Sequence, residues 1–331
     1  MPCYNVEQTL DETMQSLVEQ SMTDIEIVVV DDGSTDGTLS ILRAWRDRDE
    51  RVRVLARDHA GIIPALNAGW NACRGIYIAR MDADDLCSPV RLEKQADILD
   101  REPTLALVAS LVEGFPAEKM RKGFQIYIDW LNSLLTPEAI AREIFIESPL
   151  AHPSIMLRKE WLDRMGGYEE HGWPEDYDLW LRMTLAGARM RKIPEVLLYW
   201  REHPARLTRT DSRYAVEAFL KAKAHYLQLG PLKDRDAVIV WGSGQMGKRL
   251  SKYLLREGAP LTAFIDVDAD KIGRTRRGKP IHAPDALPEL LAKAAHPVVL
   301  AAVGSRGARQ KIRSYLEQRN LREGRDWWAV A

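Results

Sequence analysis

Acidic side chains stand in two short groups in the first third of the sequence. Asp31 and Asp32 directly follow the apolar run Ile25–Val30. Asp82 and Asp84 follow a second such run, with one residue between them. Because alternate residues of an extended chain point the same way, Asp82 and Asp84 can face one cavity. Paired carboxylates repel unless a cation lies beside them, and all-oxygen ligands favour Mg²⁺ or Mn²⁺, which often also bind phosphate oxygens. A D-x-D pair alone more often only caps turns and helices.

Alternating strand and helix patterns place these acids at the ends of strands. Repeated strand–helix units predict an α/β protein with a mostly parallel sheet, and ligands bind such sheets at the carboxyl ends of the strands. The expected strands are 25–30, 51–56 and 76–81, and the expected helices are 9–20, 38–48, 62–73 and 89–100.

The middle of the chain mixes element types, and a new α/β pattern starts after it. A helix is expected around the aromatic residues Phe124, Tyr127 and Trp130, a strand over 155–157, and helices over 177–186 and 211–229. Gly230-Pro231 and the charged run after it are the best linker candidate. We therefore predict two domains, 1–230 and 231–331.

The second predicted domain carries a glycine motif between a strand and a helix. Gly242, Gly244 and Gly247 follow the strand 237–241, and Asp266 ends the next strand. This context is typical of a small Rossmann-like βαβ domain that binds a nucleotide, with the glycines near phosphate and the acid near ribose. The alternative is a domain of the same type kept for packing or assembly, whose glycines serve only the tight turn.

Composition excludes several classes of protein. The 331 residues carry a net charge of −1, which argues against nucleic acid as the main partner. The three cysteines lack CxxC spacing, which argues against a disulfide framework or a zinc site and fits a reducing compartment. No apolar run approaches the roughly 20 residues of a membrane span, and no signal peptide is recognised. We expect a cytoplasmic protein, with peripheral attachment to the inner face of the membrane as the alternative. Residues 1–5 have the pattern of a strand's end, without the apolar residues that normally come before such a segment in a buried parallel sheet.

From Met1 to about Tyr199, an ordered set of motifs resembles the family 2 glycosyltransferases of the GT-A fold. The matching segments are Pro2-Cys3-Tyr4-Asn5, residues 27–38, Leu66-Asn67-Ala68-Gly69, residues 81–85, His152-Pro153-Ser154, Gly166-Gly167-Tyr168 and residues 175–178. The set is far more specific than any one of its members. It implies a GT-A-type domain that uses a nucleoside-diphosphate sugar.

The resemblance implies a donor site at the strand ends. Pro2 and Tyr4 match positions that pack on the nucleotide base, Tyr4 with its ring face. Asp32 matches the carboxylate that accepts the uracil N–H. Asp82 matches the residue near the donor sugar or ribose, and Asp84 matches the ligand of a Mg²⁺ or Mn²⁺ ion that contacts the diphosphate.

The resemblance also implies a catalytic group. Asp176 matches the general base, with Glu175 beside it, and His203 matches a position near the metal and diphosphate. His152 either contacts the diphosphate or acceptor, or holds a neighbouring backbone carbonyl. Arg206 lies in a basic loop that either closes over the diphosphate or is simply solvated.

These roles predict an inverting, metal-dependent glycosyltransferase. It would move a sugar from a UDP or dTDP donor to a hydroxyl of a glycan or glycolipid in cell-surface polysaccharide synthesis. The alternatives are an NAD(P)-dependent enzyme that modifies sugar nucleotides with its second domain, and a non-catalytic nucleotide-sugar-binding protein.

Overall fold

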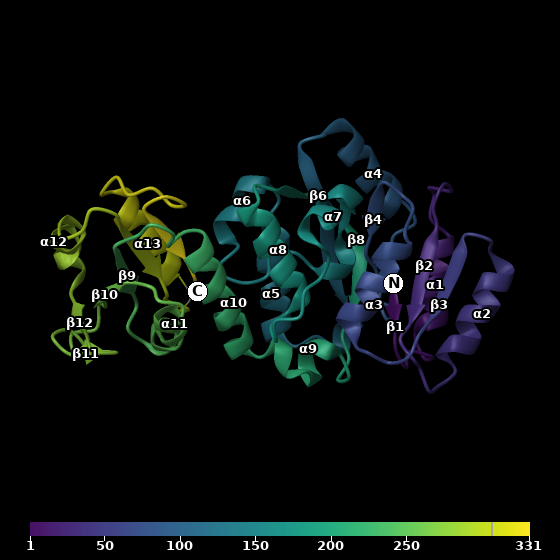
Figure 1. Ribbon diagram of the computed structural model, residues 1–331, viewed down its shortest axis with the longest axis horizontal. Helices are drawn as coiled ribbons and strands as arrows, with labels where there is room; N and C mark the ends of the chain where they lie inside the picture. The colour runs from purple at the N-terminus through teal and green to yellow at the C-terminus, as the bar shows by residue number, and fades with distance from the viewer. Residues whose placement is uncertain (306) are drawn as a thin grey trace. The chain divides into compact units, whose positions relative to one another are not determined.

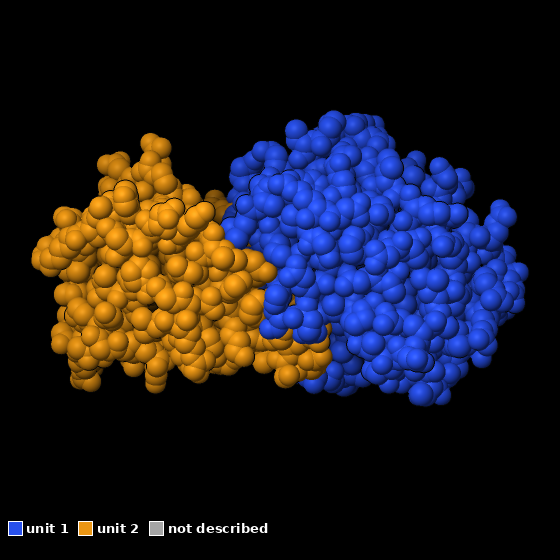
Figure 2. Space-filling model, viewed as in Figure 1, with its two compact units in different colours: residues 1–141, 149–171, 175–210 blue, residues 142–148, 172–174, 211–331 orange. Residues whose placement is uncertain are grey.

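The computed structural model describes residues 1–305 and 307–331 and divides into two compact units (Figure 2). Unit 1 comprises Met1–Ala141, Pro149–His171 and Glu175–Thr210, and unit 2 comprises Arg142–Ser148, Gly172–Pro174 and Asp211–Ala331. Among the described residues, no helix combines the length and the apolar character needed to cross a membrane.

Unit 1 begins with a three-stranded parallel sheet in the order β1-β2-β3 (Figure 1). Its strands are β1 (Pro2–Cys3), β2 (Ile27–Asp31) and β3 (Val52–Ala56), and the helices between and after them are α1 (Leu10–Val18), α2 (Thr38–Arg48) and α3 (Ile62–Ala72). Every residue of β2 is buried, as expected for an apolar strand covered on both faces. The amine of Met1 continues the ladder by donating to the Val28 carbonyl oxygen at 2.8 Å.

A five-stranded sheet completes the strands of unit 1, in the order β4-β7-β6-β8-β5. These strands are β4 (Tyr77–Ala79), β5 (Leu86–Cys87), β6 (Leu105–Phe115), β7 (Met156–Arg158) and β8 (Arg189–Arg201). The accompanying helices are α4 (Arg91–Arg101), α5 (Lys122–Ser133), α6 (Pro137–Glu143), α7 (Lys159–Met165), α8 (Glu175–Leu185) and α9 (Leu207–Thr210).

The strand directions correct one part of the prediction. The β6–β8 pairing is parallel, whereas β4–β7, β6–β7 and β5–β8 are antiparallel. Together with the first sheet, the named strands described in unit 1 make three parallel and three antiparallel pairings, so the predicted mixed sheet is present but is not mostly parallel. The reason is that the region predicted as a mixture of types supplies the two longest strands, β6 and β8, and the short antiparallel β7.

Unit 2 contains a six-stranded mixed sheet in the order β11-β12-β10-β9-β13-β14. Its strands are β9 (Ala237–Trp241), β10 (Leu261–Ile265), β11 (Thr275–Arg276), β12 (Lys279–His282), β13 (Pro297–Ala301) and β14 (Trp327–Ala329), and its helices are α10 (Val216–Leu229), α11 (Gln245–Arg256), α12 (Leu287–Ala292) and α13 (Ala308–Glu317). The named strands run parallel to their neighbours except β11 and β12. The chain leaves the central strand β9 on one side and returns on the other, so the order reverses at the carboxyl end of β9.

Helix α10 groups with unit 2 because it packs against α11. The predicted boundary lies at 230/231, whereas this division assigns residues 142–148, 172–174 and 211–230 to unit 2 as well. The helix itself starts at Val216 rather than 211, since the Asp211 carboxylate accepts the Arg213 N–H at 2.8 Å and caps a short 3-10 turn first.

Candidate functional site

The loop between β4 and β5 gathers three carboxylates. One oxygen from each of Asp82, Asp84 and Asp85 lies within 4.8 Å of the others. Helix α1 fixes this loop, because the Thr13 hydroxyl donates to the carbonyl oxygens of Ala83 at 3.1 Å and Asp85 at 2.9 Å. The carboxylates of the predicted D-x-D pair therefore lie close together, and the carboxylate of Asp85 lies beside them.

The end of strand β8 and the segment after it supply partners for two of these carboxylates. His203 Nε2 donates to Asp84 Oδ2 at 2.7 Å, and the Arg201 N–H donates to Asp85 Oδ1 at 2.7 Å. The Oδ2 atom of Asp85 is buried and has no hydrogen-bond partner among the described residues. Burial, followed by the charges of Asp84 and Asp82, raises the pKa of Asp85 well above its usual range. Burial opposes ionisation of Asp84 too, but the His203 hydrogen bond and nearby cations outweigh it and lower its pKa.

This cluster fits a divalent cation. Its donors are carboxylate oxygens, the ligands that Mg²⁺ and Mn²⁺ prefer, and one of them is buried without a partner. Asp82 and Asp84 are 29% and 24% exposed, so solvent and a ligand can reach them.

Arg80 is a buried cation beside the cluster. Its guanidinium forms an ion pair with Asp82. Burial works against its charge, but Asp82 and, more weakly, Tyr168 and Glu175 raise its pKa. The charge of Arg80 in turn acts on Asp176. Arg80 therefore connects the acidic cluster electrostatically with the start of α8.

Helix α8 begins with the predicted base and its neighbour. Asp176 Oδ1 accepts the Tyr177 N–H at 2.7 Å. Burial and the Glu175 charge raise the pKa of Asp176 to about 8. A carboxylate with such a pKa can take a proton near neutral pH. The sequence prediction thus names a group with suitable electrostatics.

His152 has two side-chain neighbours in this region. Its Nε2 lies 2.8 Å from the Tyr168 hydroxyl, and its Nδ1 lies 4.0 Å from Glu175 Oε1. Burial, with a smaller effect of Arg80, lowers the pKa of His152 well below its usual range, so the ring is neutral. His152 therefore lies beside Glu175. Its ring nitrogens have side-chain neighbours, so the alternative in which His152 bonds a neighbouring backbone carbonyl does not describe these contacts.

The carboxyl end of β2 forms the other side of the predicted site. Asp32 is buried, and its carboxylate accepts the Gly61 N–H at 2.8 Å and lies 2.8 Å from His59 Nδ1. Tyr4 stacks on the His59 ring, with centroids 4.0 Å apart. Pro2 pairs with Val30 in the β1–β2 ladder.

The end of β1 lies between the two sides. Burial raises the pKa of the Cys3 thiol to about 12, and the charges of Asp31, Asp82 and Asp84 all add to the effect. Cys3 itself pairs with Asp31 in the β1–β2 ladder.

Arg206 corrects the expectation of a solvated loop. It is only 9% exposed, and its guanidinium lies over the rings of Trp200 at 4.6 Å and Phe124 at 5.0 Å. It also pairs with Glu202 at 3.4 Å, and its charge helps to lower the pKa of Asp84.

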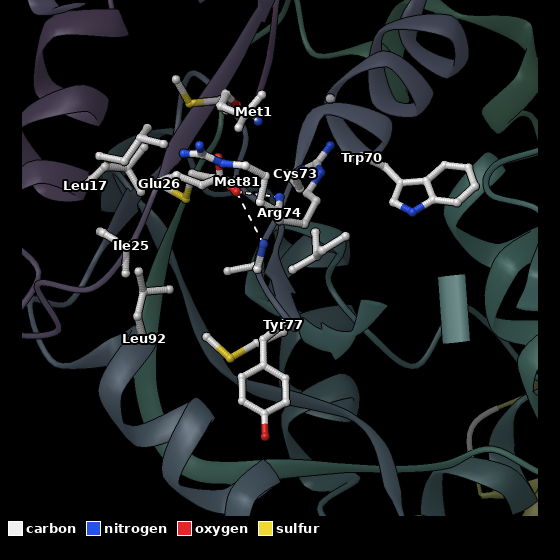
Figure 3. A pocket seen from close by; sticks show the side chains of 18 of the residues that line it. Met1, Leu17, Ile25, Glu26, Trp70, Cys73, Arg74, Tyr77, Met81 and Leu92 are labelled. Carbon is white, nitrogen blue, oxygen red and sulfur yellow. Dashed lines mark hydrogen bonds and ion pairs between the residues drawn. The ribbon is translucent and has the colours of Figure 1, made fainter. Parts of the chain in front are cut away.

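A cavity of about 600 Å³ adjoins this region (Figure 3). Residues of β2, α3, β4 and α4 line it, and many of their side chains are apolar, including Leu17, Ile25, Met81 and Leu92. The Glu26 carboxylate is already bonded to the backbone N–H groups of residues 74 and 75. We interpret this space as a packing cavity, which touches the site through Pro2, Arg80 and Tyr168.

The glycine motif of unit 2 has a different environment. Gly242 has φ +113°, and a Cβ on Gly247 would lie 1.8 Å from the Gly242 carbonyl oxygen, so both glycines are required by packing. A Cβ on Gly244 would meet no described atom within 4 Å. Asp266 Oδ2 accepts the N–H and the hydroxyl of Ser243 at 2.9 and 2.6 Å. The carboxylate of the predicted ribose-binding acid, Asp266, is therefore already hydrogen-bonded to a residue of the glycine motif.

Sequence reasoning missed three residues of the site. Arg80 was visible as the one charged residue in the run 76–81, and Asp85 directly follows the D-x-D pair. His59 gave no signal, because it lies in an ordinary loop and only the fold places it on Asp32.

Comparison with known proteins identifies the family of the chain. The model of the family described as "Glycosyl transferase family 2" matches residues 1–166. The amylovoran biosynthesis glycosyltransferase AmsE of Erwinia amylovora is 31% identical over 199 residues, which are 59% of this chain and 72% of that protein. The UDP-Gal:alpha-D-GlcNAc-diphosphoundecaprenol beta-1,3-galactosyltransferase of Escherichia coli is 27% identical over 232 residues, 70% of this chain and 82% of that protein.

The fold also resembles a solved structure. S. aureus TarS 1-349, in complex with UDP-GlcNAc, has a TM-score of 0.57 at 19% identity, covering 77% of this chain and 70% of that one. At this identity, the likeness concerns the fold, which is of the GT-A type.

Proposed function

Because the chain belongs to glycosyl transferase family 2, we propose that it transfers a sugar from UDP or dTDP to a hydroxyl of a glycan or glycolipid, with inversion at the anomeric carbon. One observation carries the proposal. The carboxylates Asp82, Asp84 and Asp85 and the base candidate Asp176 are linked electrostatically through buried Arg80.

Donor and acceptor classes follow from the relatives. One is named for a UDP-galactose donor and a diphosphoundecaprenol-linked acceptor, and another for amylovoran biosynthesis. These names support a uridine donor and a role in cell-surface polysaccharide synthesis. A lipid-linked acceptor would bring the reaction to the inner face of the cytoplasmic membrane, with the protein attached peripherally.

Asp84 would hold a divalent cation together with Asp82 or Asp85, and His203 would orient Asp84. When bound, Mg²⁺ or Mn²⁺ neutralises the charge that grows on a diphosphate leaving group. Arg80 balances the charge of Asp82, which would otherwise repel the donor.

Asp176 would accept the proton of the attacking hydroxyl. The acceptor oxygen bonds to the anomeric carbon as the bond from that carbon to the diphosphate breaks, and the hydroxyl proton goes to an Asp176 carboxylate oxygen. One displacement from the opposite face inverts the anomeric centre. His152, which is bonded to the Tyr168 hydroxyl, would shape this end of the site next to Glu175.

For unit 2 we propose an accessory role rather than redox catalysis. The Gly242–Gly247 turn is Rossmann-like, but Ser243 already holds Asp266. A titration with NAD(P)H followed by fluorescence tests the redox alternative, which predicts tight binding and a nicotinamide signal.

A donor panel tests the main proposal. Thermal melting with UDP-, dTDP- and GDP-sugars, each with and without Mn²⁺, should give the largest rise for one uracil or thymine donor with the ion. Hydrolysis or transfer of that donor should then release the nucleoside diphosphate. Absence of any shift with all donors would contradict the proposal.

A further inference from the structure

The loop between β3 and α3 places an imidazole on the carboxylate after β2. His59 Nδ1 lies 2.8 Å from Asp32 Oδ2 and 3.0 Å from the Asp32 backbone oxygen. The same ring stacks on Tyr4, with centroids 4.0 Å apart and planes 19° apart. A flat ring therefore covers Tyr4 while directing a nitrogen at the carboxylate of Asp32.

The carboxylate of Asp32 lies among groups of the β3–α3 loop. Gly61 N–H donates to Oδ2 at 2.8 Å, and Ala60 N–H reaches the two oxygens at 3.2 and 3.3 Å. Arg57 Nε lies 3.3 Å from Oδ1, at ion-pair distance and without a hydrogen bond. With His59 Nδ1 at 2.8 Å from Oδ2, four groups surround the buried carboxylate.

His59 is the donor that can leave most readily. Two of the others are backbone groups, and Arg57 is also bonded to the Pro64 carbonyl oxygen. The side chain of His59 is 51% exposed, and Tyr4 is 44% exposed. Rotation of one imidazole into solvent would free one position on Oδ2 and one face of Tyr4 together.

We propose that His59 occupies the place of the nucleobase in the free enzyme and that the donor's base displaces it. The inference rests on the proposed function and deepens it. The ligand that replaces His59 must supply what the imidazole supplies: a flat ring for Tyr4 and an N–H in the plane of that ring for Asp32. Uracil and thymine carry such an imide N–H at N3, whereas the N3 of cytosine is an acceptor. The device selects an imide-bearing pyrimidine, because any other ring leaves the buried carboxylate with one donor fewer.

Calorimetric titration of the full chain with UDP and Mn²⁺ tests the displacement. His59→Ala removes the competitor, so UDP should bind about three- to tenfold more tightly than to wild type. His59→Phe keeps the stack but donates no N–H, and its affinity should lie between the two. Inorganic pyrophosphate with Mn²⁺ has no base, so its affinity should be the same in all three proteins. CDP should bind wild type at least about tenfold more weakly than UDP.

A matched control comes from unit 2. His225 pairs with Glu257 at 3.2 Å and stacks near Trp173 at 5.5 Å, so His225→Ala removes the same kinds of contact elsewhere. It should leave UDP affinity unchanged, and thermal melting should show that every variant is folded.

The outcomes separate the two levels of the proposal. Unchanged UDP affinity in His59→Ala overturns the displacement alone, and weaker binding overturns it by making His59 a residue that holds the base. Failure of the folded wild type to bind either UDP or pyrophosphate with Mn²⁺ would instead contradict the proposed function, and the inference with it.

Discussion

Both units carry an Asp-x-Asp pair after a strand, and the side chains around the two pairs differ. Asp82 and Asp84 follow β4, and Asp266 and Asp268 follow β10. In unit 2, Lys271 lies 3.5 Å from Asp266 and 2.9 Å from Asp268. The pKa of each of these two carboxyls is lowered. The pair in unit 2 therefore has its own cation.

The pair in unit 1 is joined by a third acid instead. Asp85 adds a carboxylate whose Oδ2 has no partner among the described residues, and its pKa is raised by burial and by its two neighbours. Arg80 pairs with Asp82, and His203 pairs with Asp84. The Asp-x-Asp pair itself therefore has partners in both units, and the difference is the third carboxylate, Asp85, whose Oδ2 has none among the described residues. A buried carboxylate oxygen without a partner indicates a ligand, whereas a fully partnered pair indicates a structural turn.

Asp176→Asn should show the largest effect on unit 1. The amide cannot accept the hydroxyl proton, so we expect kcat to fall about 10²- to 10⁴-fold while UDP affinity stays within about twofold. Steady-state transfer with the donor found in the thermal panel measures the first quantity, and calorimetry measures the second. Asp266→Asn is the control from unit 2 and should keep kcat. Turnover near normal in Asp176→Asn would remove this residue from the role of base.

Asp84→Asn should produce the next largest effect. It removes one negative charge and one ligand from the acidic cluster, so Mn²⁺ affinity should fall about 10- to 100-fold. Electron paramagnetic resonance of free Mn²⁺ measures it directly. The matched change in the other Asp-x-Asp pair, Asp268→Asn, should have no effect, because Lys271 already balances that pair. Equal Mn²⁺ affinity in the Asp84 variant and the wild type would show that the ion does not bind this cluster.

The acids at the strand ends could be predicted from the sequence, but the residues that surround them could not. Asp32, Asp82 and Asp84 were predicted after strands, and they follow β2 and β4, although these two strands lie in different sheets rather than side by side. The long strands β6 and β8 were not predicted. Strand β8 contains charged residues such as Lys192, which are not expected in a buried strand. The structure buries Lys192 because its ammonium group donates to the Leu131 carbonyl oxygen at the end of α5. The difference between the two Asp-x-Asp pairs could not be predicted from the sequence either. Lys271 can neutralise Asp266 and Asp268 only because the loop folds so that its ammonium group lies beside them.

Glu175→Gln should shift the pH dependence of unit 1. The pKa of Asp176 is raised to about 8 by burial and by the Glu175 charge, so kcat/KM should rise with pH as Asp176 loses its proton. Removing the neighbouring charge lowers the pKa of Asp176, and the rising limb should move to lower pH by up to about one unit. The position of the limb, not its height, is the measurement.

The control for this shift is an exposed acid of the same unit. Glu195 is 50% exposed and pairs with Lys94 on the surface, so Glu195→Gln should leave the limb in place. A bound cation lowers the limb in all variants alike. If the rising limb of the kcat/KM pH profile does not move in Glu175→Gln, a group other than Asp176 controls that profile.

Ser243→Ala should have the smallest effect, and it concerns the stability of unit 2 alone. The Ser243 side chain is fully buried, and its hydroxyl donates to Asp266 Oδ2 at 2.6 Å. Losing a hydrogen bond to a charged group costs about 1–3 kcal/mol of unfolding free energy, which corresponds to a fall of roughly 2–8 °C in the melting temperature. Ser251→Ala is the matched control, because that buried hydroxyl bonds only within its own helix, to the Lys248 carbonyl oxygen at 3.2 Å. Transfer activity should stay unchanged in both variants. If Ser243→Ala keeps its melting temperature but changes affinity for a nucleotide, the carboxylate of Asp266 serves a ligand rather than the fold, and the contrast between the two units disappears.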